Sequence, residues 1–396
     1  MDMQSKAKKL IEMIQTASVE WKPLGEVVPI SRGKRLVRSQ LQDNGQYPVY
    51  QNSLQPLGFY DDQNCRAYMT FVIAAGAAGE IGFSDIEFWA ADDCYYFDCP
   101  KEILHDKFLY YFLLSERHQL TSQIRKASVP RLGRVSIEKI KIPIPPLEIQ
   151  QKIVKILDKF TKLEATLEAE LALRKRQYQY YRDFLLDFDN QIGGGIADGY
   201  KGRLKDVVWK TLGEVGEVRM CKRILKGQTS SFGDVPFYKI GTFGRNPNSY
   251  ISRKLFEEYK EKYHYPRVGE VLISASGTIG RTVIFDGQDA YFQDSNIVWI
   301  ENDEKQVLNK YLFYFYQIAK WDVAEGGTIP RLYNEGLRKM LVPIPPLPEQ
   351  EKIVAILDKF DTLTHSISEG LPHEIALRRK QYEYYREQLL AFPKAA

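Results

Sequence analysis

Residues 142–163 read IPIPPLEIQQKIVKILDKFTKL, and residues 342–363 repeat them as VPIPPLPEQEKIVAILDKFDTL, with 15 of the 22 aligned positions identical. A second pair of blocks follows, LALRKRQYQYYRDFLL at 171–186 and IALRRKQYEYYREQLL at 375–390. The first pair is offset by 200 residues and the second by 204, so the second copy holds four additional residues between its blocks. The chain therefore consists of two copies of one plan, in which a globular unit is followed by a long helix.

The helical blocks have a clear start and a regular apolar pattern. Each is entered through prolines, and because proline keeps the preceding residue extended, we expect the helices to begin near Leu147 and Leu347. Apolar residues then recur at alternating steps of four and three, the heptad pattern of a coiled coil. The two stripes are Ile153, Leu157, Phe160, Leu167, Leu171, Tyr178, Tyr181 and Leu185, and Ile353, Leu357, Phe360, Ile367, Leu371, Ile375, Tyr382, Tyr385 and Leu389. The four additional residues amount to one helical turn, which we expect the second helix to absorb by local unwinding.

Neither helix can bury its stripe alone, and each is the obvious partner of the other. If the repeats are related by a pseudo-two-fold axis, the helices run antiparallel, and about 40 residues of helix span roughly 60 Å. Strand-like segments such as 71–75 and 270–276 alternate in the globular units with helical ones. The predicted fold is therefore α+β, with two globular domains separated by two long helices that form an antiparallel coiled coil. The predicted boundaries are 1–146, 147–187 (first helix), 188–199 (glycine-rich linker), 200–346 and 347–391 (second helix).

Composition sets only broad limits. A chain of 396 residues with 44% hydrophobic content can bury substantial cores, whereas a net charge of +4 says nothing about nucleic acid until the positions of the charges are known. The sequence has neither a signal-peptide pattern nor an apolar run of membrane-spanning length, so we expect a cytoplasmic protein without a membrane partner. Reduced thiols are expected at Cys65, Cys94, Cys99 and Cys221; with His105 their spacing fits no standard zinc pattern, and no metal site is predicted.

Clusters of positive charge follow two similar openings, WKPLGEV at Trp21 and WKTLGEV at Trp209. A shift of 188 residues superposes three cations of the first cluster on three of the second, although the units otherwise differ greatly here. This match favours a shared anionic partner, for which DNA phosphate is the natural candidate, over a solvated charged loop. The predicted phosphate-contacting residues are Arg32, Lys34, Arg35, Arg38, Arg219, Lys222, Arg223 and Lys226.

Reading a DNA sequence also requires polar side chains directed at base edges. The candidates lie on two turn-like segments that differ between the units, as two different half-sites would require: Tyr50, Gln51, Asn52 and Ser53 in the first, and Thr242, Arg245, Asn246 and Asn248 in the second. Further candidates for the DNA backbone flank the entry to each helix, where packing against the helices is an equally good account: Lys126, Ser128, Arg131, Thr328 and Arg331.

The basic, tyrosine-rich helix ends place aromatic residues on several faces of a thin rod, which leaves some of them exposed. A protein partner that binds both copies alike would cover them. The predicted docking residues are Tyr178, Tyr181, Arg182, Tyr382, Tyr385 and Arg386.

No catalytic constellation is visible in the sequence, and we predict no catalytic residue. An Asp/Asn-Pro-Pro-Tyr/Phe motif is missing, because both PPL copies follow Ile-Pro. The stretches GAAGEIG (76–82) and SGTIG (276–280) lack the Lys-Ser/Thr of a phosphate-binding loop and are predicted to be tight turns between strands. Two alternatives to a non-catalytic DNA reader stay open: a self-sufficient DNA methyltransferase or nuclease, and a coiled-coil adaptor that binds proteins.

The chain as a whole resembles the specificity subunit of a type I restriction-modification system. The resemblance lies in the twin proline-rich entries, the twin ILDKF helices, the QYxYYR ends and the WKxLGE starts, and LEATLEAEL (163–171) is similar to the type IC subgroup. It implies two target-recognition domains, each reading one half of a split sequence in double-stranded DNA, with the helices setting the gap. It further implies two modification subunits that methylate adenine with S-adenosylmethionine, and restriction subunits that use ATP and Mg²⁺, with no cofactor on this chain.

Overall fold

The computed structural model describes residues 3–17, 19–125, 128–188, 206–323 and 330–393. The chain forms two compact units, each with segments from both copies. Unit 1 comprises Met1–Ala169 and His373–Ala396, and unit 2 comprises Glu170–Pro372. The boundary falls inside one continuous helix, α6 (Leu147–Leu186). Most of the predicted linker at 188–199 lies outside the described residues.

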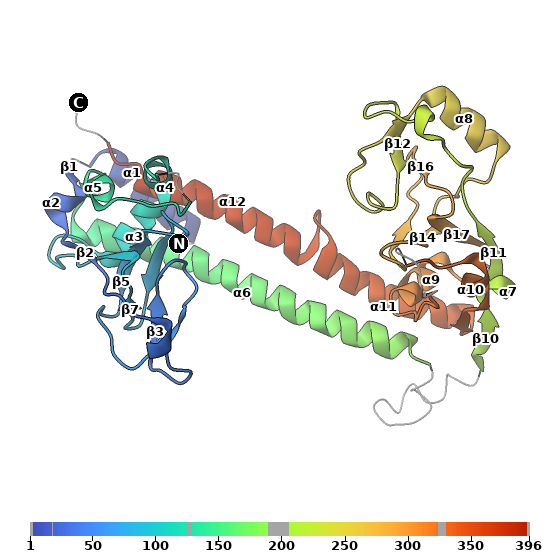
Figure 1. The fold of residues 1–396 in the computed structure, drawn as a ribbon, viewed down its shortest axis with the longest axis horizontal. Coiled ribbons are helices and arrows are strands. Elements are labelled where there is room, and N and C mark those ends of the chain that lie inside the picture. Colours follow the sequence, from blue (N-terminus) through green and yellow to red (C-terminus); the bar gives the residue numbers. More distant parts are fainter. Residues whose placement is uncertain (1–2, 18, 126–127, 189–205, 324–329, 394–396) are drawn as a thin grey trace. The chain divides into compact units, whose positions relative to one another are not determined.

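The described residues of unit 1 form three small sheets (Figure 1). One pairs β1 (Glu20–Pro23) with β9 (Lys141–Ile144), another has the order β2-β8-β5-β6 (Ile30–Arg32, Cys94–Phe97, Met69–Ile73, Ile81–Ser84), and the third β4-β3-β7 (Gly58–Tyr60, Tyr47–Tyr50, Trp89–Ala90). The helices are α1 (Met3–Gln15), α2 (Leu24–Val27), η1 (Arg38–Gln40), α3 (Asp106–Ser115), α4 (Arg117–Ser122) and α5 (Arg134–Glu138), with the first half of α6 and most of α12 (Gly370–Leu390).

Unit 2 repeats this topology. The matching sheets are β10-β18 (Val208–Thr211, Leu341–Ile344), β11-β17-β14-β15 (Gly216–Arg219, Ile297–Asn302, Val271–Ser274, Thr282–Ile284) and β13-β12-β16 (Tyr250–Ile251, Val235–Tyr238, Tyr291–Phe292). The helices are α7 (Leu212–Val215), η3 (Lys226–Gln228), α8 (Arg253–Lys262), α9 (Asn309–Tyr316), α10 (Asn334–Lys339) and α11 (Leu347–His365). Register is repeated too, since Trp21 pairs with Pro143 and Trp209 with Pro343. The predicted α+β duplication is confirmed at the level of strand order.

The glycine-containing stretches form the turns that were predicted. GAAGEIG joins β5 to β6, and SGTIG joins β14 to β15, both antiparallel pairs. Gly79 and Gly280 have φ angles of 84° and 79°, which glycine adopts without the penalty that a Cβ would bring.

A buried glutamine attaches each globular part to its helix. Gln150, in the first turn of α6, is fully buried; its amide nitrogen donates to Pro145 O and Ile103 O at 2.8 Å each, and its Oε1 accepts from the backbone N–H of His105. Gln350 makes the same three bonds in α11, to Pro345 O, Gln306 O and the N–H of Leu308. Both helices begin where the sequence predicted, at Leu147 and Leu347.

Two turns further along, an aspartate makes a second attachment. Asp158 Oδ1 accepts a 2.6 Å hydrogen bond from Tyr111 Oη and lies 2.8 Å from Lys107 Nζ. In unit 2, Asp358 receives the same two contacts from Tyr314 and Lys310, at 2.6 Å each. The repeated ILDKF motif therefore carries an interaction with α3 or α9 as well as the apolar stripe.

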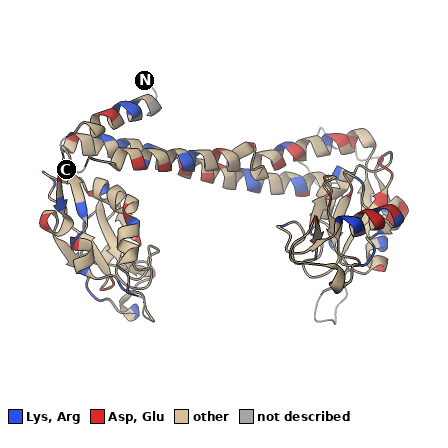
Figure 2. Ribbon diagram, turned by 90° about the horizontal axis from the view of Figure 1, so that it is seen from above, with Lys and Arg blue, Asp and Glu red and all other residues tan. Residues whose placement is uncertain are grey.

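Within each unit the helices pair antiparallel, as predicted. In unit 1, Phe160 of α6 stacks on Tyr385 of α12, while Glu164 and Glu168 pair with Arg379, so position rises along one helix as it falls along the other. In unit 2, Tyr178 contacts His365 and Tyr181 stacks on Phe360. Acidic and basic residues interleave along these helices (Figure 2), and the pairs Glu170–Arg174 and Glu374–Arg378 sit at matching positions.

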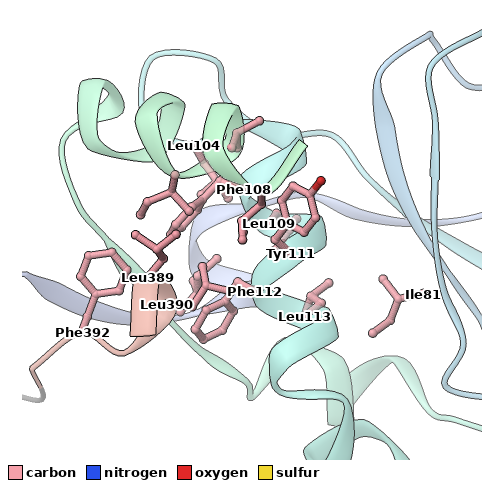
Figure 3. Packing of buried hydrophobic residues seen from close by; sticks show 14 of the residues in the cluster. Ile81, Leu104, Phe108, Leu109, Tyr111, Phe112, Leu113, Leu389, Leu390 and Phe392 are labelled. Atoms are coloured by element: carbon pink, nitrogen blue, oxygen red, sulfur yellow. The ribbon is translucent and has the colours of Figure 1, made fainter. Parts of the chain in front are cut away.

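The end of the chain completes the core of unit 1. Leu389, Leu390 and Phe392 pack against Phe108 and Phe112 of α3 (Figure 3). Trp21 Nε1 donates to the carbonyl of Pro393 at 2.8 Å, which ties the C-terminal segment to β1. In unit 2, Leu185, Leu186 and Phe188 of the first copy belong to the core in the same way.

The second helical copy differs from its prediction. Residues 366–369 belong to no helix, and α12 begins at Gly370 with a φ of 73°. A Cβ on Gly370 would lie 2.3 Å from Thr362 O, so this turn requires glycine. The four additional residues are extruded from the helix instead of being absorbed by unwinding, and Ile367, predicted to lie in the stripe, is 85% exposed.

We expect Gln150→Ala and Gln350→Ala each to lower the free energy of unfolding by about 2–4 kcal/mol, because each leaves two buried carbonyls and one N–H without partners. Urea denaturation of the full chain measures the loss. The neighbouring exposed residues provide controls, since Gln151→Ala and Glu351→Ala should change the free energy of unfolding by less than about 0.5 kcal/mol. Equal effects of buried and exposed substitutions would contradict this role for the glutamines.

Stability should also fall in mild acid through His105. Its Nδ1 accepts the N–H of Lys107 at the start of α3, and burial lowers its pKa below 6.5, outweighing the opposing effect of Asp106 and Asp158. A pKa depressed on folding means that the contribution is complete above pH 6.5 and is lost as pH falls towards the folded value. His105→Asn keeps an acceptor at the cap without this titration, so its melting temperature should depend less on pH below 6.5 than that of the wild type. Parallel pH profiles would disprove the assignment.

Candidate nucleic-acid interface

Four cations from different segments of unit 2 line one depression of about 460 Å³. Arg223 and Lys226 come from the chain after β11, Lys239 follows β12, and Arg331 precedes α10. Thr229, Gln293, Asp294, Ser295 and Asn296 add polar groups to the lining. We call this feature the cation-lined depression. It joins two predicted phosphate-contacting residues to a helix-entry residue 105 or more positions away in the sequence.

Hydrogen bonds that involve the backbone hold the segments that carry these cations. Lys226 opens η3, where Gln228 Oε1 accepts from the N–H of Leu225 at 2.8 Å. Arg331 is held at the turn after β14, because Leu332 N donates to Ala275 O and Gly277 N to Pro330 O. The repeated PRL tripeptide therefore docks onto the SGTIG turn.

Unit 1 has cations at the matching positions. Arg38 opens η1, whose Gln40 accepts from the N–H of Val37. Leu132 N donates to Ala74 O and Gly76 N to Pro130 O, which places Arg131 beside the GAAGEIG turn. Arg35, Arg38 and Arg131 thus correspond to Arg223, Lys226 and Arg331 in topology as well as sequence. All six are exposed, and within the described part of the chain only Arg223 has a carboxylate nearby, Asp294 at 4.0 Å.

Three other predicted phosphate contacts are engaged inside their own unit. Arg219 lies 2.6 Å from both Glu217 and Glu301, so its charge is paired within unit 2, and its contact with phosphate stays a prediction. Lys222 Nζ lies 5.0 Å from the centre of the Tyr263 ring. Arg32 Nε donates to Asp92 O at 2.6 Å but remains exposed, and Lys34 is exposed with no ion pair to a described residue.

The predicted base-contacting residues of unit 1 differ in their exposure. Tyr50 is half-buried, with its ring centre 4.7 Å from that of Phe71 and 5.5 Å from that of Phe88, and its contact with a base stays a prediction. Gln51 is half-buried and Ser53 closes a local turn with Gln55, whereas Asn52 is exposed beside Gly76, near Arg131.

In unit 2 the predicted base-contacting segment lies outside the cation-lined depression. Thr242 Oγ1 exchanges hydrogen bonds with the backbone of Lys239, while Arg245, Asn246 and Asn248 are exposed. The depression is lined instead by Gln293, Asp294 and Asn296, which the sequence prediction missed. No repeat offset of the sequence points to these residues, because Asp92 and Asp294 correspond only by their place two residues after β7 and β16.

Among the helix-entry residues, Ser128, Arg131 and Arg331 are exposed. Lys126 and Thr328 lie outside the described residues.

Two predicted docking tyrosines are buried. Tyr178 is 4% exposed and Tyr385 5% exposed, because both lie on the heptad stripe and pack on the opposite helix; burial raises the pKa of Tyr178 to about 12. These two side chains therefore offer a partner little free surface, and their docking role stays a prediction. Tyr181 remains 37% exposed, and Arg182, Tyr382 and Arg386 are half-buried. The outward rings are Tyr180 and Tyr384, 56% and 57% exposed at matching positions.

The cysteines are buried as free thiols. Burial raises the pKa of Cys65 and of Cys221 to about 12, and His105 serves as a helix cap. No group of three or more His, Cys, Asp or Glu side chains suited to a metal ion occurs among the described residues. Nor does any described helix have the length and hydrophobicity needed to cross a membrane.

Comparison with known proteins agrees with the duplication. The family model for the type I restriction modification DNA specificity domain matches residues 18–173 and again residues 205–377. A Haemophilus influenzae protein, named as a type I restriction enzyme specificity subunit, is 47% identical over 97% of this chain and 98% of its own length. The EcoR124I/EcoR124II specificity subunit of Escherichia coli is 32% identical over 98% of both chains.

Solved structures show the same fold at low sequence identity. The S subunit of a type I restriction-modification system from M. genitalium superposes with a TM-score of 0.60 at 16% identity, covering 96% of this chain and 98% of that one. With two family matches that together span most of the sequence, the chain belongs to the type I restriction-modification DNA specificity family.

Proposed function

We propose that this chain is the DNA-recognition subunit of a type I restriction-modification complex, in which units 1 and 2 each bind one half of a bipartite target. The observation that carries the proposal is the matched set of exposed cations, Arg35, Arg38 and Arg131 in unit 1 and Arg223, Lys226 and Arg331 in unit 2. Lysine and arginine contacts to phosphate position a protein on DNA without reading its sequence. We call these six residues the phosphate anchors. Because both units carry them, both can bind the DNA backbone in the same way.

The segments beside these anchors differ between the units, as the reading of two different half-sites requires. After β3, unit 1 continues with Gln51 and Asn52, whereas unit 2 continues after β12 with Lys239 and Ile240. After β7, unit 1 has Ala91 where unit 2 has Gln293. Direct readout depends on such donor and acceptor groups at base edges.

The helices supply surfaces for protein partners. The exposed rings of Tyr180 and Tyr384 recur at equivalent positions, which is what two identical modification subunits would bind. These subunits would carry S-adenosylmethionine for adenine methylation, and restriction subunits would contribute ATP- and Mg²⁺-dependent cleavage. No step of that chemistry is assigned to this chain.

Footprinting tests the proposal directly. The chain, co-purified with its modification subunits, should protect two short specific segments separated by a gap whose sequence is free. A single contiguous palindrome would contradict two different readers. Binding without sequence preference would instead favour a protein adaptor.

Replacing the phosphate anchors should change the salt dependence of DNA binding. Arg35→Ala, Arg38→Ala and Arg131→Ala together should weaken binding to all DNA sequences, and the salt dependence of log K should become shallower by about 3, since each lost phosphate contact removes about 0.9. Replacing Arg223, Lys226 and Arg331 together by alanine should weaken binding and flatten the salt dependence to the same extent.

Arg253→Gln provides the control, because Arg253 already pairs with Asp289 on the surface of unit 2. It should leave the slope unchanged. The phosphate assignment fails if the triple variants and this control behave alike.

A further inference from the structure

The cation-lined depression contains one carboxylate among its lining residues, that of Asp294. Its side chain is 23% exposed, and Oδ2 lies 4.0 Å from Arg223 Nε, the outer limit of an ion pair. A phosphate group cannot occupy the position next to a carboxylate without repulsion. Asp294 therefore offers an acceptor within a surface that otherwise attracts anions.

The segment that carries Asp294 is held in a defined conformation. Gln293 N donates to Tyr238 O at 2.9 Å, Asn296 N to Asp294 O at 2.7 Å, and Ala275 N to Asn296 O at 2.7 Å. Ser295 has a φ of 54°, a left-handed conformation that costs about 1 kcal/mol or more in a residue other than glycine. The surrounding strands thus hold this turn in an unfavourable backbone state, which is common at binding sites.

The amides on either side have their oxygens already occupied. Gln293 Oε1 accepts from the N–H of Ile240 at 3.0 Å, and Asn296 Oδ1 accepts from Ser276 Oγ at 2.7 Å. Their amide nitrogens donate to no described residue. The turn therefore combines a carboxylate acceptor with two amide donors, a mixture suited to a base edge and not to a phosphate.

The exocyclic amino groups of cytosine and adenine are the hydrogen-bond donors that DNA presents in its major groove, and aspartate is an acceptor for such a group. We propose that Asp294 accepts a hydrogen bond from the amino group of one base in the half-site bound by unit 2, so that this position must be cytosine or adenine. The surrounding cations hold the flanking phosphates. Thymine and guanine present a keto oxygen at the corresponding edge, which the carboxylate repels.

This inference rests on the proposed function and is tested by selecting bound sequences from a random double-stranded DNA library with the full complex. The wild type should select an amino-bearing base at one position of the second half-site. Asp294→Asn can donate as well as accept, so its preference there should fall by about tenfold, while the remaining positions and the first half-site are unchanged. Asp294→Glu, which keeps the carboxylate, should retain part of the preference.

Two controls distinguish base reading from a structural role. Glu258→Gln removes a negative charge from the outer helix α8 of the same unit and should leave the selected sequence unchanged. Asp92→Asn changes the matching residue of unit 1 and should leave the second half-site unchanged. A uniform loss of affinity with Asp294→Asn, at an unaltered selected sequence, would mean that Asp294 only positions Arg223 and would overturn the inference. A wild type without any sequence preference would overturn the proposed function itself.

Discussion

The buried side chains of Gln150 and Gln350 are the contacts on which the rest of the structure depends. Each amide bonds the proline-rich entry of a helix to the segment just before α3 or α9. Proline leaves carbonyl oxygens without local N–H partners, and a buried carbonyl must be satisfied. One glutamine satisfies two of them and a backbone N–H at the same time, which fixes the direction in which the helix leaves its globular part.

That direction determines how each unit closes. In unit 1 the first half of α6 pairs with α12. The residues at and just after the end of α12, Leu389, Leu390 and Phe392, fill the core beside α3. In unit 2 the second half of α6 pairs with α11, and Leu185, Leu186 and Phe188 at its end fill the core in the same way. Each core is therefore built from both copies of the repeat, and neither globular part buries its apolar surface with its own segment alone.

Because the helices are rigidly attached, each unit can keep its phosphate-binding cations constant while the turns that would read bases vary. Cations at equivalent positions need only the shared framework, because every DNA backbone presents the same charge. The turns after β3 and β7, and after β12 and β16, lie at the ends of short strands, where side chains can change without disturbing the core. The extruded residues 366–369 show the same tolerance in the helical part, where a whole turn is accommodated by Gly370.

Repeats and periodicity determined much of this protein from the sequence alone: the duplication, the helix starts at Leu147 and Leu347, the antiparallel pairing and the glycine turns. These features depend on local chemistry or on a period that can be counted along the chain. Only the tertiary structure decided how far each tyrosine of the heptad stripe is covered, because Tyr178 is 4% exposed and Tyr181 of the same stripe is 37% exposed, and burial depends on what packs against each side chain. It also decided that Arg219 is neutralised by Glu301 and that Asp294 joins Arg223 and Arg331, since charges far apart in sequence meet only when the strands are assembled.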